Sequence, residues 1–320
     1  MFIMSDTRNL QTTIKNILSE PRFQKPNGLT FHSFTAQTGE HIRYGYCPAA
    51  KSKNLVLILP GFIEPSEKYF EVIKDLNEAG HSIAVLDWPC QGQSSRYLKN
   101  THKRHSMGFD QEMAILHELI TNHLPQDNQR LCLLGHSMGG HLAIRYVEEY
   151  GDKHVHKLLV SAPMIDIRIA PPILKIIAPI IATIAHHTGC GSFYTFGDSD
   201  WYLEKEKEPL SHDDVRSHLH RALLVQDPSL ISAGPTFSWL YHALRSCKKL
   251  AKAADKITCP TLILGAGEDI IVNTNATRNF AQKVPHATYT EIKDAYHEIL
   301  IESDVYRDQA MKEITTFLSD

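Results

Sequence analysis

The stretch GHSMG at residues 135–139 separates two segments of different character. Residues 130–134 form a short apolar run that is typical of a buried strand, and residues 140–150 carry apolar side chains at helical spacing. Between a strand and a helix, a G-x-S-x-G pattern predicts a sharp turn with the serine at its tip, because the glycines relieve crowding there. Ser137 is therefore the candidate nucleophile, and a glycine-rich turn without chemistry is the alternative.

Short apolar or β-rich runs recur along the chain, and helical patterns lie between them. Most runs are continuously apolar, as expected for strands buried on both faces. They comprise residues 55–59, 83–86, 131–134, 157–160, 262–264 and 288–292, preceded by a loosely alternating pair at 29–35 and 41–46 that is typical of an edge hairpin. This alternation predicts an α/β fold, a mostly parallel central sheet with helices on both faces.

The same patterns divide the chain into three parts. Residues 1–27 are largely polar and carry no clear core pattern, so we expect an N-terminal extension. Residues 28–164 and 257–320 contain the patterns of the α/β core. Residues 165–256 are helix-rich and interrupt the alternation just after the strand at 157–160. We expect this insertion to form a helical cap over the carboxyl edge of the sheet.

A serine hydroxyl is a weak nucleophile, so the site needs a base and a group that orients the base. In an open parallel sheet, reactive groups collect where the strands end at their carboxyl edge. Asp269 follows the strand at 262–264, and His297 follows the strand at 288–292. Both residues fall on the same edge as Ser137, in the chain order Ser, Asp, His that this class of site uses.

These placements predict a role for each residue. His297 would take the proton of Ser137 and later protonate the leaving alkoxide, and Asp269 would orient the imidazole. Glu268 is one residue early and remains an alternative acid, whereas His286 precedes its strand and is expected at the opposite edge. A turn-forming carboxylate and a surface histidine are the alternative interpretations of Asp269 and His297.

An acyl-transfer site also needs hydrogen-bond donors for the oxyanion. The backbone N–H of Met138, the residue after the nucleophile, is the first expected donor. The strand at 55–59 runs into residues 60–64, where Gly61 lets the backbone approach closely and Phe62 offers an N–H. We therefore expect Phe62 to be the second donor, with a plain turn as the alternative.

Six segments together resemble the α/β-hydrolase fold, and within it the monoacylglycerol lipase and bacterial lysophospholipase group. They are residues 60–64 with Lys68-Tyr69, 87–96, 135–140, 161–164, 234–239 and 295–300, spread over roughly residues 28–318. The nucleophile motif is common to many hydrolases, whereas Gln91-Gly92-Gln93-Ser94 and residues 296–300 more specifically resemble the bacterial lysophospholipases. The resemblance implies hydrolysis of a lysophospholipid or monoacylglycerol ester through an acyl-serine intermediate.

Two positions depart from the pattern of this group. Its lipases usually begin the oxyanion segment with His-Gly, and Pro60-Gly61 stands here instead. Residues 88–90 replace the charged residues that are common after Asp87. Neither departure removes a catalytic group, so general carboxylesterase, thioesterase and acyltransferase remain alternative activities. A non-enzymatic ligand receptor on the same fold is the alternative from another class.

Composition limits the partners and the compartment. The 320-residue chain has a formal net charge of −3, which gives no electrostatic support for nucleic-acid binding. Its six cysteines include no C-x-x-C pair, and no secretory signal is evident at the N-terminus, so the cytoplasm is the expected compartment. Adjacent His186 and His187 point apart, and with Cys190 they make a poor metal site. We expect neither a metal nor an organic cofactor.

The insertion carries the sequence signal for the substrate. Residues 169–184 hold more apolar side chains than one buried helix face requires. Such a surface could line an acyl-chain pocket or contact a lipid interface at the inner membrane surface, and packing against the core is the alternative. The apolar run at 176–185 is about half a bilayer span and contains Pro179, so we do not expect it to cross a membrane.

Overall fold

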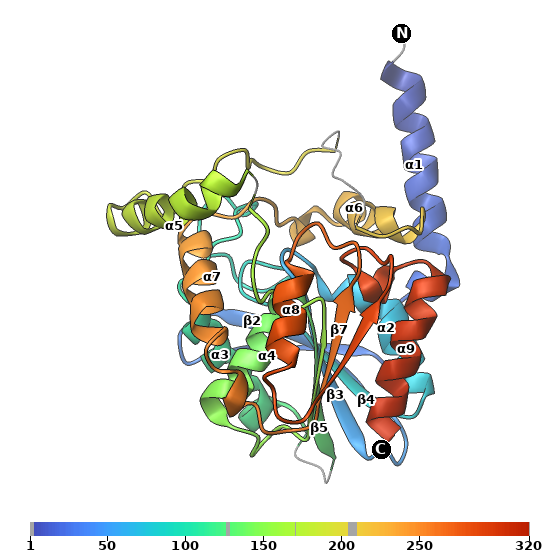
Figure 1. Cartoon of the computed structure of the whole chain (residues 1–320). Helices are drawn as coiled ribbons and strands as arrows, with labels where there is room; N and C mark the ends of the chain where they lie inside the picture. Colours follow the sequence, from blue (N-terminus) through green and yellow to red (C-terminus); the bar gives the residue numbers. More distant parts are fainter. Residues whose placement is uncertain (1–2, 126–128, 170, 204–209, 320) are drawn as a thin grey trace.

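A computed structural model describes residues 3–125, 129–169, 171–203 and 210–319 (Figure 1). Its centre is an eight-stranded sheet in the order β1-β2-β4-β3-β5-β6-β7-β8. The strands are β1 (Thr30–Thr35), β2 (His41–Cys47), β3 (Asn54–Leu59), β4 (Ser82–Leu86), β5 (Arg130–His136), β6 (Lys157–Ser161), β7 (Thr261–Ala266) and β8 (Ala287–Ile292). Strands β1 and β2 are antiparallel to their neighbours, and all pairs from β4 to β8 are parallel. The predicted α/β fold is confirmed.

The two faces of the sheet carry separate cores, which explains why the central strands are continuously apolar. In β3, Leu55, Leu57 and Leu59 pack into one core and Val56 and Ile58 into the other, since successive side chains of a strand point to opposite faces. The first core is covered by α3 (Phe109–Glu118), α4 (Ser137–Tyr150) and α8 (Thr274–Ala281), the second by α2 (Phe70–Glu78) and α9 (Asp304–Ser319) (Figure 1).

Helix boundaries differ slightly from the sequence patterns. The pattern at 69–76 begins as a 3₁₀ turn, Ser66–Tyr69, before α2. The pattern at 113–120 continues past α3 into a π-helical turn, Leu119–His123. Apolar periodicity therefore located both helices but not the change of helix type at their ends.

The segment between β6 and β7 contains α5 (Pro172–His187), α6 (Arg216–Gln226) and α7 (Phe237–Leu250). Residues 170 and 204–209 of the predicted insertion lie outside the described residues. Helix α7 buries Trp239, Ala243 and Leu250 in the first core. Helix α5 contacts α7 and reaches away from the sheet at the upper left of Figure 1. Within the described ranges, no helix is long and apolar enough to cross a membrane.

The N-terminal segment differs from the expectation that residues 1–27 carry no core pattern. Residues Ile3–Ser19 form α1, and Ile14 and Ile17 are buried in a third cluster with Leu219 and Leu223 of α6. Two isoleucines three positions apart lie on the same face of a helix, but within a polar segment they are too few to produce a clear periodic signal. The extension therefore packs against the segment that joins β6 to β7.

Candidate active site

The nucleophile motif forms a tight turn between β5 and α4. Ser137 is the first residue of α4 and has a φ of 51°, in the left-handed region that non-glycine residues rarely adopt. A Cβ atom on Gly139 would lie 2.0 Å from the carbonyl oxygen of Leu59, and one on Gly135 would lie 2.6 Å from the carbonyl oxygen of Gly139. Glycine is therefore required at position 139 for the turn to pack against the end of β3, and at position 135 for the turn itself to close.

Three predicted residues from three segments lie in hydrogen-bond contact at this turn. The Nε2 atom of His297 is 2.9 Å from Oγ of Ser137, and its Nδ1 atom is 2.7 Å from Oδ2 of Asp269. The exposed fractions of Ser137, Asp269 and His297 are 6%, 2% and 4%. With Nδ1–H donating to the carboxylate, Nε2 is left to accept the hydroxyl proton of Ser137. This is the geometry of a nucleophile, a base and a group that orients the base.

The carboxylate of Asp269 has further donors. Its Oδ1 atom accepts hydrogen bonds of 2.8 Å from the backbone N–H groups of Ile271 and Val272. Burial by itself would raise the pKa of Asp269, but the hydrogen bond and charge of His297, together with these N–H groups, lower it below its usual value. The carboxylate is therefore ionised at neutral pH and can stabilise an imidazolium.

The two alternatives considered from sequence lie elsewhere. Glu268 is exposed to solvent, and the residue that contacts His297 is Asp269. His286 is also exposed and precedes β8, at the end of the strand opposite to His297. Position at the carboxyl edge of the sheet therefore separated His297 from His286, whereas burial and the contact with His297 distinguish Asp269 from Glu268 at the same edge.

The predicted oxyanion segment lies beside the nucleophile turn because β3 and β5 are paired in register. Leu59 at the end of β3 pairs with Gly135, so the residues that follow each strand are neighbours. A Cβ atom on Gly61 would lie 3.0 Å from Cδ2 of His136, which shows how closely the two turns approach. Met138 lies in the first turn of α4, where backbone N–H groups have no acceptor within the helix.

A buried ionic cluster supports both the oxyanion segment and the loop that carries His297. The ammonium group of Lys68, whose side chain is 2% exposed, lies 2.7 Å from Oε1 of Glu64 and 2.6 Å from Oε1 of Glu298. The second carboxylate oxygen of Glu64 accepts hydrogen bonds of 2.6 Å from the Gly61 N–H and the Tyr69 hydroxyl. Lys68 thus connects residues 60–64 to the residue directly after His297.

Electrostatics keep this cluster charged. Burial would lower the pKa of Lys68, but the carboxylates of Glu298 and Glu64 raise it above its usual value. Burial would raise the pKa of Glu64, but Lys68 lowers it well below its usual value. The sequence patterns alone predict no role for Glu64, Lys68 and Glu298. The sequence signal that could have identified them is a Glu-Lys pair four positions apart, with Glu64 in the oxyanion segment and Lys68 after it. A second signal is the acid that directly follows His297.

His136 lies directly against the base, with the ring centroids of His136 and His297 4.9 Å apart. Burial lowers the pKa of His136 to about 4, against the opposing effect of Glu64. His136 is therefore neutral at pH 7. A neutral ring at this position adds no positive charge that would oppose protonation of His297.

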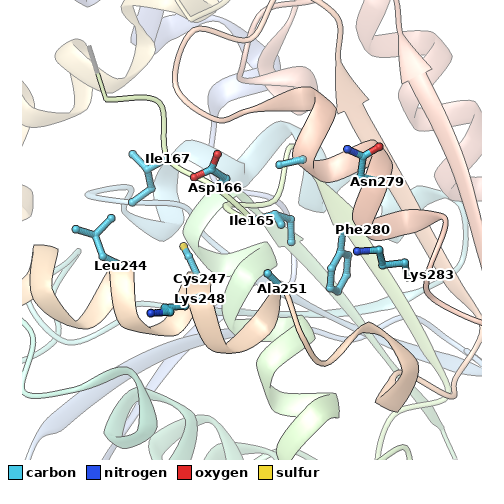
Figure 2. A pocket seen from close by; sticks show the side chains of 11 residues that line it. Ile165, Asp166, Ile167, Leu244, Cys247, Lys248, Ala251, Asn279, Phe280 and Lys283 are labelled. Carbon is cyan, nitrogen blue, oxygen red and sulfur yellow. The ribbon is translucent and has the colours of Figure 1, made fainter. Parts of the chain in front are cut away.

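A cavity of about 400 Å³ lies away from these residues, between α7, α8 and residues 165–167 (Figure 2). Its described lining includes Cys247, Phe280 and Lys283 but none of the five predicted site residues. In the parts of the chain that the structure describes, no group of three or more His, Cys, Asp or Glu side chains could hold a metal ion. His186 instead lies 3.0 Å from the hydroxyl oxygen of Ser238.

A serine at a strand-to-helix turn, with an acid after β7 and a histidine after β8, defines the α/β-hydrolase class. Residues 50–304 match the model of the Hydrolase_4 family, described as serine aminopeptidase, S33. The chain belongs to this family.

Relatives of similar length and solved structures agree with the class. The chain is 28% identical over 274 residues to a probable lysophospholipase L2 of Haemophilus influenzae, covering 85% of this chain and 86% of the relative. It is 26% identical over 295 residues to lysophospholipase L2 of Escherichia coli K12, covering 89% of this chain and 86% of that relative. A monoglyceride lipase from Saccharomyces cerevisiae superposes with a TM-score of 0.71 at 18% identity, over 94% of this chain and 98% of that one. The chain is thus an α/β hydrolase similar to lysophospholipases and monoglyceride lipases.

Proposed function

We propose that the protein is a serine hydrolase that cleaves the carboxylic ester of a lipid, such as a lysophospholipid or a monoacylglycerol, through an acyl-Ser137 intermediate. The observation that carries this proposal is the continuous hydrogen-bond chain from Ser137 through His297 to Asp269. The names of the relatives, lysophospholipase L2 and monoglyceride lipase, support the lipid ester as substrate.

The geometry supports a two-step reaction without a cofactor. His297 takes the proton of Ser137 as Oγ attacks the ester carbonyl, and the N–H groups of Phe62 and Met138 stabilise the oxyanion. His297 then gives that proton to the leaving alcohol. In the second step His297 takes a proton from water, the resulting attack on the acyl group releases the fatty acid, and Ser137 regains its proton. Asp269 stays ionised throughout.

The exposed surface of α5 supports a lipid substrate. Ile173, Ile176, Ile180 and Ile184 recur at helical spacing, and Ile176 and Ile180 are 68% and 56% exposed. A continuous apolar stripe of this kind is costly in water and is favoured where it meets acyl chains. We infer that the segment 165–256 acts as a cap whose α5 stripe contacts the lipid substrate at the cytoplasmic face of the inner membrane.

A fluorophosphonate probe and a substrate panel test the proposal. We expect the probe to label the wild-type protein covalently and to leave Ser137→Ala unlabelled. Folded wild-type protein that is not labelled would refute an activated serine and would favour a ligand receptor. The panel contains lysophospholipids and monoacylglycerols of several chain lengths, a short water-soluble ester, an acyl thioester and an aminoacyl anilide. Fastest turnover of the anilide, as the family description suggests, or of the thioester would refute the lipid ester as substrate.

A further inference from the structure

Two backbone carbonyls of the oxyanion segment, those of Gly61 and Glu64, accept hydrogen bonds from the buried side chain of Gln91. The amide nitrogen Nε2 of Gln91 donates to the carbonyl oxygen of Gly61 at 2.8 Å and to that of Glu64 at 3.1 Å. Gln91 is fully buried. A buried amide of this kind loses its hydrogen bonds at a substantial energetic cost, so the two contacts fix the path of residues 61–64.

The contact with Gly61 also sets the direction of the proposed oxyanion donor. The Gly61 carbonyl and the Phe62 N–H belong to one planar trans peptide, in which the C=O and N–H bonds point in opposite directions. Holding the carbonyl oxygen at Gln91 therefore turns the Phe62 N–H away from Gln91. Without this contact the peptide could rotate, because the glycine permits many backbone conformations.

The orientation of the Gln91 amide is fixed in turn by Arg104. Nε of Arg104 donates to Oε1 of Gln91 at 2.8 Å, and Nη2 contacts both carboxylate oxygens of Glu112 at 3.0 and 3.1 Å. Arginine has only donors, so Gln91 must turn its oxygen toward Arg104 and its NH₂ group toward the backbone. Arg104 Nη2 also lies 3.6 Å from Sδ of Met138, the residue that provides the other proposed donor.

We propose that Gln91 is a positioning residue for the reaction, because it orients the Phe62 N–H toward the oxyanion formed on the acyl group of the substrate. This assignment rests on the proposed serine hydrolase function. It differs from a purely structural role in one measurable respect. A positioning residue for the oxyanion donor affects the transition state more than the bound substrate, so its loss lowers kcat and leaves KM nearly unchanged.

Two substitutions remove the donor in different ways. Gln91→Glu keeps the length and the contact with Arg104 but turns a carboxylate oxygen toward two carbonyl oxygens, which repels the Gly61 peptide. Gln91→Met keeps a similar side-chain length and removes the hydrogen bonds without adding charge. It is the test variant if Gln91→Glu does not fold. Gln309→Glu is the matched control, since Gln309 also donates from Nε2 to a backbone carbonyl, that of Val305, but is exposed on α9.

The experiment measures kcat and KM on a short p-nitrophenyl ester and the affinity of a trifluoromethyl ketone, which forms a tetrahedral oxyanion on the serine. Loss of one oxyanion donor costs about 100-fold or more in kcat, so we expect a loss of about 10- to 100-fold in Gln91→Met and a larger one in Gln91→Glu. Ketone affinity should fall in the same proportion as kcat/KM, with KM changed less than twofold. Gln309→Glu should retain wild-type kinetics.

The outcomes separate this inference from the function on which it rests. An active wild type together with Gln91 variants that keep kcat within twofold would overturn the positioning role and leave the hydrolase proposal standing. A rise in KM at unchanged kcat, or unchanged ketone affinity in a slow variant, would overturn it as well. A wild-type protein that neither hydrolyses esters nor reacts with the ketone would overturn the hydrolase proposal itself.

Discussion

Replacing Lys68 by methionine should destabilise the protein strongly, because the substitution leaves two buried carboxylates without their common cation. Lys68 lies within 2.7 Å of Glu64 and Glu298, whose side chains are 6% and 13% exposed. Removing one partner of a buried ion pair costs about 3–5 kcal/mol. The Gly61 N–H and the Tyr69 hydroxyl still donate to Glu64, so we expect the lower end, about 3 kcal/mol near neutral pH.

The loss should depend on pH in a defined direction. In the wild type the lowered pKa of Glu64 contributes stability above the usual pKa of a glutamate, and this contribution is lost as the pH falls through the lowered value. In Lys68→Met the buried carboxylate of Glu64 has lost its cation, so burial raises its pKa. Glu64 therefore takes up a proton as the pH falls, and the folded variant recovers stability. The difference in unfolding free energy between wild type and variant should therefore be larger at pH 8 than at pH 5.

Urea unfolding followed by tryptophan fluorescence at both pH values measures this difference. Lys256→Met is the matched control, since Lys256 pairs with Glu148 at 2.9 Å but its own side chain is 58% exposed. Exposed pairs contribute little to stability, so the control should unfold close to the wild type. A Lys68→Met variant as stable as the wild type at pH 8, or one whose deficit does not shrink at pH 5, would refute the reasoning.

Two further predictions concern catalysis and the substrate. Asp269→Asn should lower kcat about 10³- to 10⁴-fold, because an amide NH₂ facing His297 favours the tautomer that cannot accept the Ser137 proton. Steady-state kinetics on a short ester measure this loss. A loss below tenfold would contradict the prediction. The double variant Ile176→Ser and Ile180→Ser should lose activity on long-chain acyl esters in vesicles but not on a short soluble ester. Val305→Ser, at an equally exposed apolar position on α9, is the control. Equal losses of the isoleucine double variant on both substrates would contradict the proposed lipid contact.

Local patterns carried most of the fold prediction. The central strands were identifiable because both of their faces are covered, which makes runs such as residues 55–59 continuously apolar. The positions of Asp269 and His297 followed from one topological rule, that parallel strands end at a common edge. That rule requires only the strand positions and no knowledge of distant contacts.

The supporting residues could not be inferred in the same way, because their partners are distant in sequence. Lys68 and Glu298 are 230 positions apart, and nothing in the local sequence of either residue specifies the other. Gln91 and Arg104 both follow β4, but Gln91 reaches the Gly61 carbonyl, 30 positions earlier in the chain, only once the loops after β3 and β4 have packed together. For α1, Ile14 and Ile17 gain a recognisable role only when α6 provides the surface that covers them.

The order of the segments has a consequence for synthesis of the protein on the ribosome. Ser137 is translated well before Asp269 and His297, which follow the last two strands of the sheet. A nascent chain that ends before β7 therefore carries the serine with neither its acid nor its base. In the proposed mechanism, the Ser137 hydroxyl thus gains nucleophilic strength only when the polypeptide is almost finished, so an incomplete chain has no esterase activity.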